Sequence, residues 1–118
     1  MKLQFKVLDR VLIVEVCGEI DHHSASEIKQ ALMEQYAQSG CIDIIFDFSD
    51  LVFMDSAGIG MLIGRYKQAC INGGVVYAAG VSPAIERIFE LSGLNKIIKR
   101  FSTVEDAINS HLIQKEVI

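Results

Sequence analysis

Runs of apolar, β-type residues alternate with helical segments along most of this chain, and this alternation constrains its fold more than any other feature. CIDIIFDF at 41–48 is a dense apolar run, typical of a central strand that is covered on both faces. VVYAAG at 75–80 is a second such run, and the shorter KIIKRF at 96–101 is a third. Strands separated by helices pair in parallel through right-handed crossovers. The chain is therefore predicted to be an α/β protein with a mixed, mostly parallel sheet flanked by helices.

Turn and capping signals place the other elements. Residues 2–8 and 11–17 are strand-like, and Asp9 and Arg10 between them are enough for a hairpin. Helices are expected over 24–39, 56–72 and 83–92, followed by a last helix after Thr103. Their predicted N-terminal signals are a capping box of Ser24 and Glu27, the pair Asp55 and Ser56, Ser82 before Pro83, and Thr103 with Asp106. The predicted order is ββαβαβαβα in a single domain spanning residues 1–118.

Composition and charge exclude several classes of partner. The net charge of −4 and pI of about 5.3 provide no basic surface for nucleic acid or for an anionic membrane. No window approaches the roughly 18 consecutive apolar residues of a membrane span, and the N-terminal MKLQFKVLDR lacks the apolar stretch of a signal peptide. We therefore expect a cytoplasmic protein whose partners are other proteins.

The three cysteines are Cys17, Cys41 and Cys70, an odd number at wide spacing within apolar runs. This pattern suits reduced thiols in the core better than disulfides or a metal site. The sequence predicts no bound metal and no cofactor.

The expected helix at 56–72 contains three glycines, Gly58, Gly60 and Gly64, each costing about 1 kcal/mol relative to alanine. Helical periodicity predicts one core-facing stripe, made of Ile59, Leu62, Ile63, Tyr66 and Cys70. The opposite side carries Ala57, Gly60, Met61, Gly64 and Gln68, with Arg65 beside them. A solvated face is usually charged, so this smooth face, together with Gly58 at its start, is predicted to bind another protein. The alternative is internal packing against a neighbouring helix.

Two loops precede helices at what should be one edge of the sheet. GEIDHHSA at 18–25 contains Glu19, Asp21, His22 and His23, and Asp55 and Ser56 begin the glycine-containing helix. Together these residues are expected to form an acidic rim beside the smooth face, able to attract a partner that carries Arg or Lys. Ser56 suits an N-cap, and its hydroxyl should also be open to phosphorylation. A phosphate there is predicted to block binding while leaving the fold intact.

Two enzymatic hypotheses for the same residues have less support than a binding function. A serine hydrolase would use Ser56, one histidine of the pair, and Asp21 or Asp55, but MDSAG lacks the glycine two residues before the serine that a nucleophile elbow needs. A phosphoesterase reading of DHH needs further Asp and His ligands, and the only other histidine is His111. We predict no catalytic residues.

GEIDHHSA, FMDSAGIGMLIGRYKQ, SPAIERIFELSGL and NKIIKRF together resemble the STAS family of anti-sigma factor antagonists, its sporulation branch in particular. The second segment contains the family's phosphorylatable serine motif, and Ser56 is the only hydroxyl in it because Ala57 follows. The resemblance implies that the unmodified protein binds an anti-sigma factor, which is an ATP-dependent serine kinase, and so releases a sporulation sigma factor. It also implies that this kinase phosphorylates Ser56 and that a serine phosphatase reverses the modification.

The resemblance leaves some points open. The DHH loop and GRYKQ favour the sporulation branch, and a stress-response circuit with another kinase is the alternative. His22 and His23 are expected mainly to shape the rim, and the free protein is expected to be a monomer.

Overall fold

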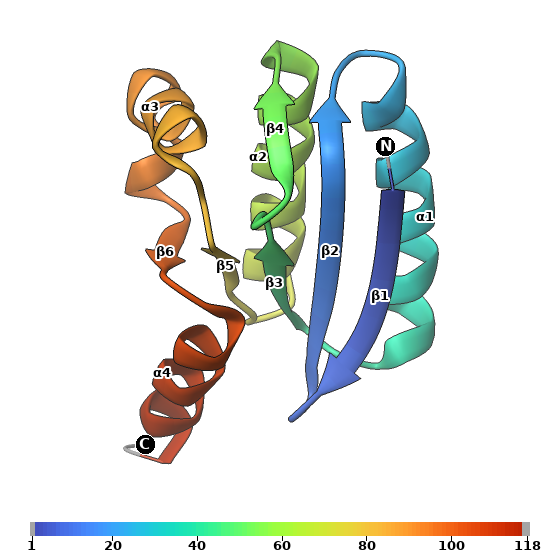
Figure 1. Ribbon diagram of the computed structural model, residues 1–118. Helices are drawn as coiled ribbons and strands as arrows, with labels where there is room; N and C mark the ends of the chain where they lie inside the picture. The colour runs from blue at the N-terminus through green and yellow to red at the C-terminus, as the bar shows by residue number, and fades with distance from the viewer. Residues whose placement is uncertain (1, 117–118) are drawn as a thin grey trace.

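A computed structural model describes residues 2–116, with the side chains of residues 2–112. The elements follow the order ββαββαβαβα, and the α/β class is confirmed (Figure 1). They are β1 (Lys2–Leu8), β2 (Val11–Ile20), α1 (Ser24–Ser39), β3 (Asp43–Asp47), β4 (Leu51–Met54), α2 (Ser56–Ile71), β5 (Val76–Ala79), α3 (Pro83–Ser92), the 3-10 turn η1 (Leu94–Lys96), β6 (Lys99–Phe101) and α4 (Val104–Glu116). In the described part of the chain, no helix has both the length and the apolar content to cross a bilayer.

The sheet is mixed and mostly parallel, as predicted. Its strands follow the order β1-β2-β3-β5-β6, and β4 pairs with β2. Among the described strands, the β1–β2 hairpin is antiparallel and the other pairs are parallel. The hairpin turns at Asp9 and Arg10, whose φ angles of 49° and 66° are left-handed and match the right-handed twist of the two strands.

One long strand joins two parts of the sheet. β2 pairs with β3 through Glu15 and then with β4 from Gly18 onward, with a bulge between Gly18 and Glu19. Gly18 has a φ of 98°, which a residue with a side chain rarely adopts. The bulge lets β2 continue along β4, so the end of β2 reaches the start of α2.

The predicted order missed β4, and the reason lies in its length and exposure. Leu51 and Met54 are buried, whereas Val52 and Phe53 are 67% and 46% exposed, so the four residues show no alternation. The expected strand at 96–101 is also shorter than predicted. Leu94–Lys96 form the turn η1, and only Lys99–Phe101 pair with β5.

Two hydrophobic cores lie on opposite faces of the sheet. The larger one contains Phe46, Phe48 and Phe89 and is covered by α1, α2 and α3. The smaller one contains Val11, Ile13 and Ile45 and is covered by α4. In Figure 1, α1 and α2 lie behind the sheet and α4 lies in front of it. A site on α1 and α2 is therefore separated from α4 by the sheet.

The predicted core stripe of α2 was partly wrong. Leu62 is fully buried, and Ile59, Ile63 and Tyr66 pack partly against the core, but Cys70 is exposed. Met61 and Arg65, expected on the outer face, are only 6% and 7% exposed. The physical reason is that α2 contacts α1 as well as the sheet, so its buried surface is wider than one stripe.

The prediction that all three cysteines lie in the core was wrong for two of them. All three are free, but only Cys41 is buried; Cys17 is half-buried and Cys70 is exposed.

Capping followed the sequence in two helices and departed from it in two. Ser82 and Thr103 accept hydrogen bonds from the amides of Ile85 and Asp106, at 3.2 and 3.0 Å. The capping box at Ser24 was wrong, because Asp21 binds the amides of His23 and Ser24 instead. Ser56 is not the cap of α2 either, as described below.

Candidate functional site

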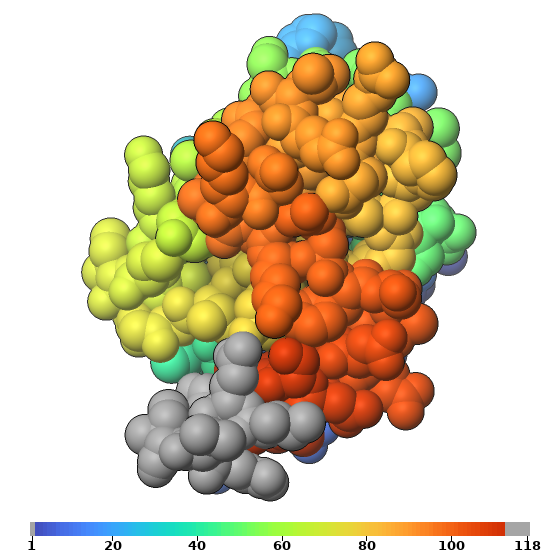
Figure 2. Space-filling model, turned by 90° about the vertical axis from the view of Figure 1, so that its left-hand side faces the viewer, coloured from blue at the N-terminus to red at the C-terminus, as the bar shows by residue number. Residues whose placement is uncertain are grey.

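The end of β2 and the end of β4 bring the two predicted loops together. Ile20 lies opposite Met54 in the parallel pair, and the Asp55 amide donates to the Ile20 carbonyl at 3.0 Å. The His22 amide donates to Asp55 Oδ2 at 3.2 Å. The loop at 18–25 and the start of α2 thus share one edge, as expected, and both lie at the upper end of the molecule (Figures 1 and 2).

Asp55, not Ser56, is the N-cap of α2. Its Oδ1 accepts hydrogen bonds from the amides of Ala57 and Gly58, at 2.9 and 3.3 Å. Ser56 is therefore the first helical residue, and its side chain is exposed. Within the described residues, no hydrogen bond involves the Ser56 hydroxyl. A change at that hydroxyl leaves the cap of the helix in place.

The β2–α1 loop holds its carboxylate in a tight turn. Asp21 Oδ1 accepts from the amides of His23 and Ser24, both at 2.9 Å, and from the Ser24 hydroxyl at 3.2 Å. The Ser24 amide is the largest influence on the pKa of Asp21, and together these donors lower that pKa although partial desolvation opposes them. Asp21 therefore stays ionised at neutral pH.

The other rim residues surround this turn. Glu19, His22 and His23 are exposed, and the two imidazole rings are 4.0 Å apart between centroids. His22 Nδ1 lies 3.9 Å from Asp55 Oδ2, a distance and an exposure at which an ion pair contributes little. The structure thus brings Glu19, Asp21, His22, His23, Asp55 and Ser56 to one edge.

The smooth face of α2 forms one wall of a groove. This groove has a volume of about 330 Å³ and runs between α1 and α2, lined by Ala25, Ser26, Lys29, Ala57, Gly60, Met61, Gly64 and Arg65. Five of the residues predicted on sequence grounds to bind a partner are therefore side by side. Met61 and Arg65 lie in the floor of the groove rather than on an exposed face, because α1 packs next to them.

The three glycines of α2 have different roles. A Cβ at Gly58 would lie 2.7 Å from Met54 Cγ and 2.9 Å from Ile20 Cγ2, so this glycine permits close internal packing. A Cβ at Gly60 or Gly64 would meet nothing within 4 Å. The prediction that Gly58 contacts a partner is therefore wrong, because this glycine is buried against Met54 and Ile20, whereas Gly60 and Gly64 leave open space in the groove.

A second groove includes Ser56 in its lining. Its volume is about 300 Å³, and it is lined by Met54, Asp55, Ser56, Ile59, Ile88, Leu91 and Ser92. Leu91 is 79% exposed. Ser56 thus lines the mainly apolar groove, and the next residue, Ala57, lines the groove between α1 and α2; sequence periodicity pointed only to the latter.

The geometry lacks the contacts that the two enzymatic readings require. Although His22 faces Asp55, no hydrogen bond within the described residues joins an imidazole to the Ser56 hydroxyl. His22 and His23 also belong to no group of three ligand atoms close enough for one metal ion in the part of the chain that the structure describes.

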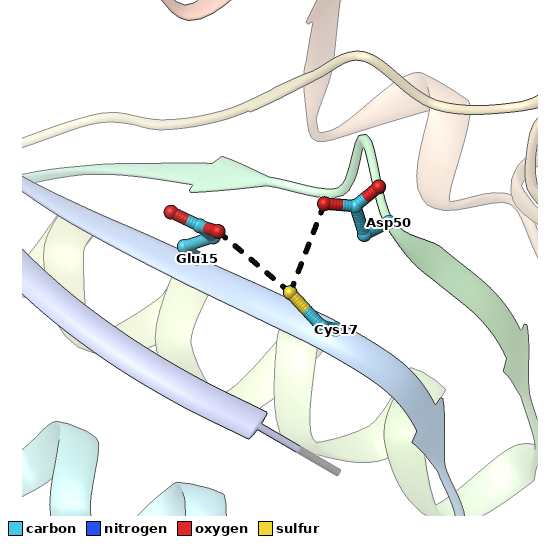
Figure 3. Close-up of side chains that lie close together, drawn as sticks. All are labelled: Glu15, Cys17 and Asp50. Carbon is cyan, nitrogen blue, oxygen red and sulfur yellow. Dashed lines mark hydrogen bonds between the residues drawn. The ribbon is translucent and has the colours of Figure 1, made fainter.

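One cluster that could hold an ion lies elsewhere. The ligand atoms of Glu15, Cys17 and Asp50 lie within 4.8 Å of one another (Figure 3). Cys17 Sγ is 3.7 Å from Glu15 Oε1 and 3.9 Å from Asp50 Oδ2. Partial burial, then the Asp50 and Glu15 carboxylates, raise the pKa of the Cys17 thiol. The alternation of Glu15 and Cys17 along β2 was visible in the sequence, but Asp50 arrives from the turn before β4.

Comparison with known proteins identifies the family of this chain. The STAS domain model matches residues 2–107. Over 98 residues the chain is 35% identical to the anti-sigma F factor antagonist of Paenibacillus polymyxa, covering 83% of this chain and 84% of that protein. It is 31% identical, also over 98 residues, to the anti-sigma-B factor antagonist of Staphylococcus aureus, covering 83% and 90%.

A solved structure agrees with this assignment. The Bacillus cell fate determinant SpoIIAA in its phosphorylated form matches with a TM-score of 0.73 and 29% identity, over 92% of this chain and 98% of that one. The chain therefore belongs to the STAS domain family and is similar over most of its length to anti-sigma factor antagonists.

Proposed function

We propose that this protein is an anti-sigma factor antagonist that works by partner switching. In its unmodified form it binds an anti-sigma factor that is also an ATP-dependent serine kinase, and this binding releases a sporulation sigma factor. The kinase phosphorylates Ser56 and so ends the binding, and a serine phosphatase restores the binding form. The protein acts in the cytoplasm, as a monomer when free, and catalyses no reaction itself.

The observation that carries the proposal is the position of Ser56. Its exposed side chain lies at the acidic rim and lines one groove, and the next residue lines the other, so a partner seated there covers it. A phosphate adds a charge of about −1.5 to −2 at neutral pH. Next to Asp55 and Asp21, that charge repels any acidic part of the partner and must be desolvated on binding. Binding is therefore lost.

The fold tolerates the modification for a local reason. Asp55 supplies the cap of α2, so the Ser56 hydroxyl is not needed for helix stability. A helix N-terminus also favours negative charge. The related SpoIIAA has a solved structure in a phosphorylated form, which supports the idea that a domain of this fold can accept phosphate.

Titration calorimetry with the cognate anti-sigma factor tests the proposal. Ser56→Asp should keep the wild-type melting temperature and lose most of its affinity, whereas Ser56→Ala should bind and resist inactivation by kinase and ATP. The matched control is Ser102→Asp, an exposed serine in the turn before α4, which should bind normally. Equal affinity of phosphorylated and unmodified protein would contradict the switch.

A stress-response circuit is the second candidate. The 31% identity to the Staphylococcus aureus anti-sigma-B factor antagonist is close to the value for the anti-sigma F factor antagonist. Measuring affinity for a sporulation and a stress-response anti-sigma factor side by side distinguishes the two, since the true partner should bind at least about tenfold more tightly.

A further inference from the structure

Arg65 is a buried cation whose hydrogen-bonding capacity is only partly used. Arg65 is 7% exposed, and its Nε has no hydrogen-bond partner among the described residues. Nη1 donates to Gln68 Oε1 at 3.1 Å, which is a neutral acceptor. No carboxylate among the described residues lies within 4.0 Å of the guanidinium. Burial without a counter-charge lowers the pKa of Arg65.

A buried charge is normally paired, because taking it out of water is costly unless an opposite charge compensates. Arginine holds its charge at any physiological pH and offers a planar fork that fits a carboxylate. An arginine in this condition therefore points to an anion that is supplied from outside the domain.

The groove next to Arg65 has room for such an anion. Gly60 and Gly64 leave open space above the α2 backbone, and Ala25 and Ala57 add little bulk. Lys29, on α1, provides a second cation at the same groove, and no residue that lines it carries a carboxylate. The groove is thus small, positively charged and beside the acidic rim.

We propose that the α1–α2 groove receives an aspartate or glutamate side chain of the partner protein, and that Arg65 pairs with its carboxylate. This inference rests on the proposed function, in which the partner is an anti-sigma factor. The site then has two poles: the rim attracts a basic residue of the partner and the groove accepts an acidic one. Two opposite charges at fixed places set the orientation of the partner as well as its affinity.

The test measures binding of the cognate anti-sigma factor by calorimetry. Arg65→Met keeps a long apolar side chain in the groove floor, and we expect it to fold and to lose affinity by about 30-fold or more. Arg65→Lys keeps the charge without the fork, and we expect a smaller loss. If Arg65→Met does not fold, Arg65→Lys and Lys29→Met still test the proposal, because each of them should weaken binding of the anti-sigma factor. Lys67→Met, which removes an exposed cation from the same helix, should bind as the wild type does.

Replacing each acidic residue of the partner by its amide identifies the occupant. One such change should cost no additional affinity when combined with Arg65→Met, because the two groups interact. Wild-type affinity in a folded Arg65→Met protein, while Ser56→Asp still abolishes binding, would overturn this inference and leave the proposed function standing. A third outcome is that millimolar inorganic phosphate competes with the partner for binding while no amide substitution in the partner changes its affinity. That result would assign the groove to a free anion and would also overturn this inference. Absence of binding by the wild type would overturn both.

Discussion

At the scale of single residues, the glycines of α2 test the interpretation of the groove. Gly60→Ala and Gly64→Ala add a methyl group in open space, so each should raise the free energy of unfolding by up to about 1 kcal/mol through helix propensity. Gly58→Ala places a methyl group against Met54 and Ile20 and should lower it by about 1 kcal/mol, because overpacking outweighs the propensity gain. Urea denaturation of the three variants measures the difference in sign.

A bulky residue at the same positions separates packing from binding. Gly60→Leu should reduce partner affinity with little change in melting temperature, since its Cβ meets nothing within 4 Å and the rest of the side chain extends into the groove. A Gly60→Leu protein that melts several degrees lower would show that the groove closes in solution, and a stable variant with unchanged affinity would show that the partner binds elsewhere.

The Cys17 thiol provides a prediction about pH. Its pKa lies above the ordinary value because burial and two nearby carboxylates disfavour the thiolate. Alkylation of Cys17 should therefore begin at higher pH than in an unfolded peptide. Asp50→Asn removes one negative charge, so the midpoint should move to lower pH. Peptide-resolved mass spectrometry of iodoacetamide labelling follows this residue alone.

The matched control for the thiol is Asp9→Asn, which makes the same change of charge in the hairpin turn. That variant should leave the midpoint of Cys17 labelling unchanged. If both aspartate variants shift the midpoint equally, overall charge rather than the neighbouring carboxylate sets the pKa.

At the scale of elements, the cap of α2 is predicted to link stability to site geometry. Asp55→Ala removes the acceptor for the amides of Ala57 and Gly58 and for the His22 amide, and should cost about 1 to 2 kcal/mol of unfolding free energy. Asp55→Asn keeps an oxygen acceptor in place and should lower the unfolding free energy by only a few tenths of a kcal/mol. Thermal and urea unfolding compare them; an equal loss in both variants would mean that charge, not hydrogen bonding, holds the helix end.

Sequence patterns predicted most helices and strands but not how each one packs against the others. The buried runs at 41–48 and 75–80 gave two central strands because length and apolar content suffice there. β4 was not predicted because its four residues do not alternate between buried and exposed and so carry no periodic signal. The predicted orientation of α2 was partly wrong because periodicity predicts a single buried face, whereas contact with α1 buries a second one.

The candidate site was predictable to a similar degree. The expectation that the DHH loop and Ser56 share an edge needed only parallel pairing of neighbouring strands. The N-cap of α2 is Asp55 rather than Ser56 because the backbone of Asp55 is extended, with φ and ψ of −99° and −170°. The unsatisfied Nε of Arg65 depends on how α1 packs against α2, and no local pattern of residues contains that information.

At the scale of the whole molecule, the sheet separates the proposed partner-binding side from a second polar cluster under α4. Asp43 is 4% exposed and accepts the Val75 amide at 2.9 Å, and its other oxygen lies 3.0 Å from His111 Nε2. His111 is 5% exposed and meets the Tyr77 ring edge-on. Burial and then the Asp43 carboxylate raise the pKa of Tyr77. This cluster joins β3 and β5 to the last helix.

His111→Ala should therefore destabilise the protein without altering its binding surface. Removing the imidazole from a buried carboxylate should cost about 3 kcal/mol, and the helix that covers Val11, Ile13 and Ile45 loses a contact. Affinity of the folded fraction for the partner should stay at the wild-type value, because α1 and α2 lie on the other side of the sheet. His23→Ala is the matched control with the opposite expectation: this histidine is exposed at the rim, so stability should not change. Urea denaturation and calorimetry on both variants separate the two effects, and a loss of affinity in folded His111→Ala would mean that the sheet transmits changes from one face to the other.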